Sequence, residues 1–93
     1  MMSTRAERIE QTLRAAFAPA VLDVVDESGR HARHAGRQGL PAGETHYAVT
    51  MVAESLRELS RLERSRAVHE ALDAEFKSGL HALSLTLSAP ESV

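Results

Sequence analysis

Histidines that could bind a metal ion gather in one short stretch of the chain. Residues 28–46 hold three of the five histidines (His31, His34 and His46), four of the five glycines and three arginines. Neutral imidazole is the commonest protein ligand for metal ions, and glycine disfavours regular structure. We therefore predict a long loop that offers imidazoles to a metal ion. The HxxH spacing of His31 and His34 is a weak metal signal outside a helix, and solvated histidines without a ligand role are the alternative.

The other two histidines lie in segments with regular hydrophobic patterns. His81 is the second residue of a strictly alternating segment, residues 80–88, and shares its parity with Leu83, Leu85 and Leu87. This parity places it on the core side of a predicted strand. It is therefore either a buried, hydrogen-bonded core histidine or a ligand held on a rigid strand opposite the loop. His69 is expected to be an exposed helix residue, and His46 is expected to point away from the core.

Several classes of function find no support in the residues. The chain lacks a nucleophile–histidine–carboxylate signature and a glycine-rich phosphate loop. With no cysteine it has no thiolate nucleophile and cannot bind an iron–sulfur cluster through its own thiolates. We expect no enzyme, because a chain of 93 residues disfavours a deep pocket.

Charge and hydropathy limit the partners. The net charge of −2 argues against a dominant electrostatic grip on nucleic acid, although a local basic patch remains open. The N-terminus has no apolar run, and no segment approaches the length of a membrane span. We expect a soluble, cytoplasmic protein without membrane contact.

The elements that must position these residues follow from periodicity. Thr4 and Glu7 form a capping-box pattern, which predicts the start of a helix. The helix carries one apolar stripe, made of Ile9, Leu13, Ala16 and Phe17. Pro19 ends it. Residues 20–26 and 46–52 are predicted to form an antiparallel pair of strands.

The second half of the chain changes period. A short turn is followed by a predicted helix from about Leu62 to Lys77, and Gly79 suits its C-terminal end. Residues 80–88 form the last predicted strand. The order αββααβ implies a two-layer α+β sandwich with a three-stranded sheet. We expect a single domain over residues 4–90, followed by a short tail, residues 91–93.

The same segments resemble the BolA family in order and spacing. The resemblance runs from Arg5 to Pro90 and is carried by ERIEQTLRAAF, VLDVVDESGRHA, GETHYAVTMV, EALDAEF and GLHALSLTLSAP. It implies an αββααβ fold related to class II KH domains, which agrees with the order read from periodicity.

The resemblance also implies a partner and a cofactor. BolA-like proteins pair with monothiol glutaredoxins and share a [2Fe–2S] cluster, for which the glutaredoxin cysteine and glutathione supply thiolates. The two remaining ligands would fall on His31 and His81, with His34 competing for the loop position. The isolated chain would carry no cofactor and would be a monomer or a weak homodimer.

A second implication is a DNA-binding transcriptional regulator, with Arg61, Arg64 and Arg66 contacting phosphate. The alternative is a solvated helix face, because arginine and glutamate alternate there. The family usually reads RHR at this point, whereas Ser65 stands here between two arginines. A glycine-containing turn before the helix is also replaced, by residues 56–59. These departures suit a divergent paralogue with altered partner choice.

Overall fold

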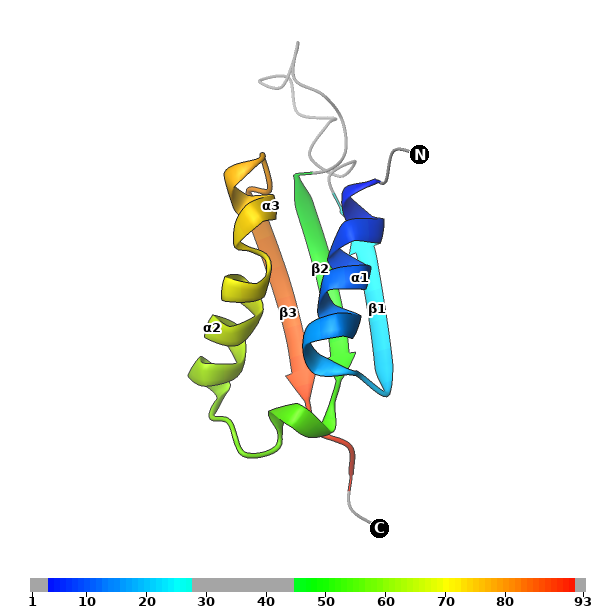
Figure 1. Cartoon of the computed structure of the whole chain (residues 1–93), viewed down its shortest axis with the longest axis vertical. Coiled ribbons are helices and arrows are strands. Elements are labelled where there is room, and N and C mark those ends of the chain that lie inside the picture. The colour runs from blue at the N-terminus through cyan, green and yellow to red at the C-terminus, as the bar shows by residue number, and fades with distance from the viewer. Residues whose placement is uncertain (1–3, 28–44, 92–93) are drawn as a thin grey trace.

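The chain folds as two layers, a three-stranded sheet and a layer of helices (Figure 1). The computed structural model describes residues 4–27 and 45–91. The elements in chain order are α1 (Arg5–Phe17), β1 (Val21–Asp26), β2 (His46–Val52), the 3-10 helix η3 (Glu54–Leu56), α2 (Arg61–Ala71), α3 (Asp73–Lys77) and β3 (Ala82–Ser88). The predicted α+β class and element order are confirmed. Within the described residues, no helix is long and apolar enough to cross a bilayer.

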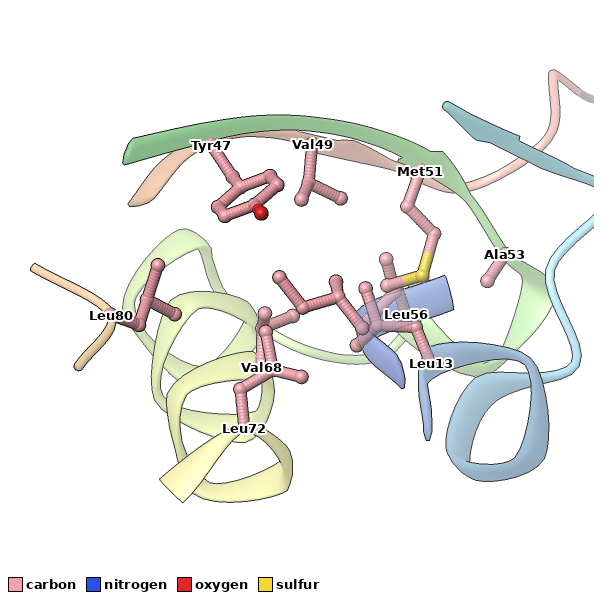
Figure 2. Close-up of a cluster of buried hydrophobic side chains, with 10 residues drawn as sticks. Leu13, Tyr47, Val49, Met51, Ala53, Leu56, Val68, Leu72 and Leu80 are labelled. Atoms are coloured by element: carbon pink, nitrogen blue, oxygen red, sulfur yellow. The ribbon is translucent and has the colours of Figure 1, made fainter. Parts of the chain in front are cut away.

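The sheet is mixed, with β2 at its centre. β1 runs antiparallel to β2, as predicted, with Leu22 opposite Met51. β3 runs parallel to β2, with His46 opposite Ala82 at the start of both strands. The helices cover one face of the sheet, and the core lies between the two layers (Figure 2). The start of β2 and the start of β3 therefore meet at one end of the sheet.

The core confirms the predicted alternation in β2. Tyr47, Val49 and Met51 point into the core, while His46, Ala48 and Thr50 lie on the other face. Residues from both layers complete the cluster: Ile9, Leu13, Ala53, Leu56, Val68, Leu72 and Leu80. Burying each large aliphatic side chain stabilises the fold by about 1.5–3 kcal/mol. This cluster holds both layers at fixed positions.

Boundaries differ from the sequence expectation at three places. The predicted helix from Leu62 to Lys77 is interrupted at Leu72, where φ is −101° and ψ is 16°. The first and last strands begin at Val21 and Ala82, one and two residues later than predicted. The predicted N-cap is confirmed, because Thr4 Oγ1 accepts the Glu7 N–H at 3.1 Å.

A cluster of charged and polar side chains, buried at Arg5 and Glu75, joins the start of α1 to the end of α3. We call it the arginine clamp (Arg5, Arg8, Glu75 and Ser78). Arg5 Nη1 donates to Glu75 Oε1 at 2.9 Å and to Ser78 Oγ at 2.8 Å. Arg8 Nε donates to Glu75 Oε2 at 2.9 Å. Arg5 and Glu75 are only 8% and 9% exposed, and buried charges are tolerated when they are paired in this way. The clamp fixes the turn that leads into His81.

Gly79 makes that turn possible. Its φ of 130° is a backbone conformation that L side chains rarely adopt, and a Cβ there would lie 3.2 Å from Arg5 Nη2. The next amide, Leu80 N–H, donates back to the Glu75 carbonyl at 2.9 Å. The expectation that Gly79 ends the helical region is confirmed. The turn and the clamp therefore pack directly against each other.

Removing the charge of Glu75 should destabilise the fold. We expect Glu75→Gln to lower the free energy of unfolding by about 3 kcal/mol, because it leaves a buried arginine without its carboxylate. Urea denaturation followed by circular dichroism measures this. Asp73→Asn is the matched control, since Asp73 pairs with Lys77 on the exposed side of the same helix. An equal effect of both substitutions would contradict the structural role of the clamp.

The same carboxylate should make stability depend on pH. Hydrogen bonding from Arg8, with the charges of Arg8 and Arg5, holds the pKa of Glu75 below its ordinary value of 4.5. A lowered native pKa adds stability above the unfolded-state pKa and loses it as pH falls through the native one. We expect the difference in free energy of unfolding between wild type and Glu75→Gln to be constant near neutrality and to shrink below pH 4.5. A difference that grows on acidification would contradict this.

Replacing Gly79 by alanine should strain the turn. We expect Gly79→Ala to lower the free energy of unfolding by about 1–3 kcal/mol, because the backbone conformation is nearly exclusive to glycine. Thermal or urea unfolding checks this, with the exposed Lys77→Ala as control. Unchanged stability would mean that the turn can adopt another conformation at no cost.

Candidate functional site

The candidate site is the end of the sheet where β1 stops and β2 and β3 begin (Figure 1). We call it the histidine edge and define it by Glu27, Thr45, His46 and His81. The Glu27 N–H donates to the His46 carbonyl at 2.8 Å, and the His81 N–H donates to the Thr45 carbonyl at 2.8 Å. Backbone hydrogen bonds thus join three chain segments that are distant in sequence.

His81 is exposed, which corrects the expectation of a buried core histidine. The alternation of Leu83, Leu85 and Leu87 does not extend back to His81, because β3 begins only at Ala82. Leu80, the residue before His81, is instead the one that enters the core, at 3% exposed. The alternation is therefore broken between Leu80 and Leu83, and the side chain of His81 is left at the surface. An exposed imidazole on a fixed backbone can reach a ligand from outside the chain.

His46 lies beside His81. The centroids of the two rings are 6.1 Å apart, and their planes are inclined by 48°. His46 Nδ1 lies 2.9 Å from Thr45 Oγ1, a hydrogen bond that fixes the ring. As predicted, His46 is on the face of the sheet opposite the core.

This edge can supply imidazole nitrogen and no sulfur. The whole sequence lacks cysteine, and residues 4–27 and 45–91 contain no group of three or more His, Cys, Asp or Glu side chains that could hold a metal ion. His31 and His34 lie outside the described residues. A metal centre at the histidine edge would therefore need ligands from residues 28–44 or from another molecule.

The structure does not bring the three candidate phosphate-binding arginines onto one surface. Arg61 and Arg66 are exposed. Arg64 is half-buried and bonds within the fold, with its Nε 2.9 Å from the Leu56 carbonyl and its Nη1 3.5 Å from the Leu87 carbonyl. Arg64 and Arg66 are two positions apart, so they project about 200° apart around α2. Arg64 thus supports the fold at the end of β3.

His69 is exposed on α2, as expected, and has partners of its own. Its Nδ1 lies 2.8 Å from the Ser65 carbonyl, so this nitrogen carries the proton. Its ring stacks on Phe76, with centroids 5.2 Å apart and planes inclined by 15°. His69 therefore serves as a local packing residue that is separate from the histidine edge.

Sequence reasoning missed two features of this region. The contact of His46 with His81 follows from the parallel register of β2 and β3, which the hydrophobic pattern does not specify. The arginine clamp joins Arg5 to Glu75 across 70 positions. Its only sequence signal is Arg5 itself, which occupies the buried side of α1 four residues before Ile9.

Comparisons with known proteins agree on one family. A family model described as BolA-like protein matches residues 13–92. Chloroplastic BOLA1 of Arabidopsis thaliana is 35% identical over 96% of this chain and 56% of its own length. The DNA-binding transcriptional regulator BolA of Escherichia coli K12 is 42% identical over 85% of this chain and 70% of its own. SufE-like protein 1 of Arabidopsis thaliana is 36% identical over 99% of this chain.

Solved structures give the same result. BolA1 from Arabidopsis thaliana superposes with a TM-score of 0.84 at 34% identity, over 97% of this chain and 96% of that one. The BolA domain of SufE1 from the same plant gives a TM-score of 0.82. The chain spans a quarter of SufE-like protein 1 and just over half of BOLA1. From the matched sequence and the shared fold, this chain belongs to the BolA-like family.

Proposed function

We propose that this chain acts as a partner of a monothiol glutaredoxin and supplies two imidazole ligands to a shared [2Fe–2S] cluster. The first ligand is His81, and the second is His31 or His34. The observation that carries the proposal is the exposure of His81 at the histidine edge, next to Glu27 and Thr45. These two residues flank the segment that contains both other histidines.

The chemistry of the donor set supports a partner of this kind. Iron–sulfur clusters need thiolate ligands, and histidines can replace two of four. Because this chain has no cysteine, the thiolates must come from the glutaredoxin and from glutathione. When bound, the cluster supplies a redox-active centre whose potential is raised by the imidazole ligands. The chain's own contribution is to hold two imidazoles in place.

The covalent distance from Glu27 favours His31 as the second ligand. Glu27 is held at the histidine edge by its bond to His46, and His31 follows four residues later. Four residues of chain span at most about 14 Å. His34 follows seven residues after Glu27. The longer segment gives His34 a longer reach, but fixing it at the cluster costs more conformational entropy.

Removing His81 should remove the cluster. We expect His81→Ala, purified together with a monothiol glutaredoxin and glutathione, to lose or bleach the visible absorption of the shared cluster. His69→Ala is the matched control, because it removes an exposed histidine elsewhere on the surface and should keep the spectrum. A wild-type spectrum in the His81→Ala complex would refute the ligand assignment.

The second ligand is identified by the same assay. His31→Ala and His34→Ala are compared separately, and we expect the larger spectral change from His31→Ala. His46→Ala tests whether the neighbouring ring only supports His81, in which case the cluster forms but is lost faster. Unchanged spectra for both loop variants would exclude the loop from the ligand set.

DNA binding is the second candidate, favoured by the name of the Escherichia coli relative and by the exposure of Arg61 and Arg66. If the chain binds DNA, its affinity for duplex DNA should fall as the salt concentration rises. Arg66→Ala should then reduce the slope of log K against log salt concentration by about 1. Fluorescence anisotropy at several salt concentrations measures this. A wild-type slope near zero would exclude binding driven by phosphate contacts.

A further inference from the structure

β1 carries apolar side chains on both of its faces. Leu22 and Val24 pack against the core, whereas Val21 and Val25 are 51% and 43% exposed on the other side. A strand with one face in water usually alternates apolar and polar residues, and a strand covered on both faces is apolar throughout. In residues 4–27 and 45–91, all helices lie on the core side of the sheet (Figure 1). β1 therefore has the residue pattern of a strand with two covered faces, but only one of its faces is covered.

The strand register gathers the exposed valines on one surface. Val52 lies opposite Val21, and Thr50 lies opposite Asp23 on one side and Thr86 on the other. Side chains at paired positions are neighbours on the same side of a sheet. Of the three large apolar side chains that are exposed in the described part of the chain, two belong to this surface. We call it the outer face and define it by Val21, Asp23, Val25, Thr50, Val52 and Thr86.

The charge of the outer face selects among partners. Asp23 is exposed between the two valines of β1, and none of the three strands contains lysine or arginine. A surface with a carboxylate and no fixed positive charge repels phosphate groups and attracts cationic side chains. The outer face therefore suits a basic protein segment and does not suit a nucleic acid or an anionic lipid surface.

The spacing of the exposed side chains of β1 matches the repeat of an α-helix. Val21, Asp23 and Val25 are alternate residues of a strand, so they follow one another at intervals of about 6.6 Å. Residues four apart in an α-helix follow one another at about 6 Å along its axis, and positions i, i+4 and i+8 belong to one side of the helix. A helix laid along β1 would therefore place these three positions over the three side chains. Apolar residues at i and i+8 would pack on the valines, and a basic residue at i+4 would lie beside Asp23.

We propose that the outer face is a docking site for a cationic amphipathic helix of another protein, with apolar residues at i and i+8 and lysine or arginine at i+4. The bound helix covers the second face of β1 and gives the sheet a helix on each side. Docking on this face is separate from the glutaredoxin pairing and does not depend on it, because the ligand His81 lies at the end of the sheet. One helix buries a small area, so the complex belongs to the weak, transient class.

A synthetic helical peptide tests the docking site on the full chain. The peptide has leucine at its first and ninth positions, arginine at its fifth, and alanine and glutamine elsewhere. We expect the NMR methyl signals of Val21, Val25 and Val52 to shift and to saturate with a Kd below about 1 mM. The methyl signals of Leu62 are the control, because Leu62 is 58% exposed on α2, outside the outer face. Equal shifts at Leu62, or no saturable shift of the valines, would overturn the proposal.

A charge exchange tests the role of Asp23. We expect the arginine peptide to bind wild type at least about tenfold more tightly than a peptide with glutamate at its fifth position, because like charges at an interface repel. Asp23→Lys should reverse this order. Glu70→Lys makes the same change of charge at an exposed residue of α2 and should leave the order as it is in wild type. Equal binding of the two peptides to wild type, or an unreversed order in Asp23→Lys, would refute docking on the outer face.

The apolar part of the contact is tested by a substitution that keeps the shape of the side chain. Val25→Thr replaces one methyl group by a hydroxyl group and should weaken binding of the arginine peptide about threefold to fivefold, because less apolar surface is buried. Leu62→Thr is the control and should leave the affinity unchanged. Equal affinities of wild type and Val25→Thr would contradict packing on the valines. Valine methyl signals that shift with the concentration of the chain alone would mean that a second copy occupies the outer face, which would also overturn the proposal.

Discussion

The buried pairing of Arg5 with Glu75 is the constraint on which the histidine edge depends. This ion pair joins the first residue of α1 to α3. Gly79, which packs against the Arg5 side chain, turns the chain so that Leu80 enters the core. Once Leu80 is buried, His81 is directed to the surface. A pair of opposite charges that is almost removed from water thus decides which side of the sheet a distant imidazole occupies.

Most of the fold could be predicted from local patterns. The apolar stripe of α1, the alternation of β2 and the ending of the helical region at Gly79 each reflect a rule that acts within a few residues. The strand β2 was placed without error. The break at Leu72 could not be predicted, because the residues on both sides suit a continuous helix and the packing of Leu72 is a property of the whole core.

The candidate site was harder to predict because it is assembled from distant segments. Parity placed His81 on the core side of its strand, and the structure places it outside. The failure has one cause: parity holds only within a strand, and the residue that enters the core here precedes the strand. The contact with His46 needed the parallel register of β2 and β3, which periodicity alone does not encode.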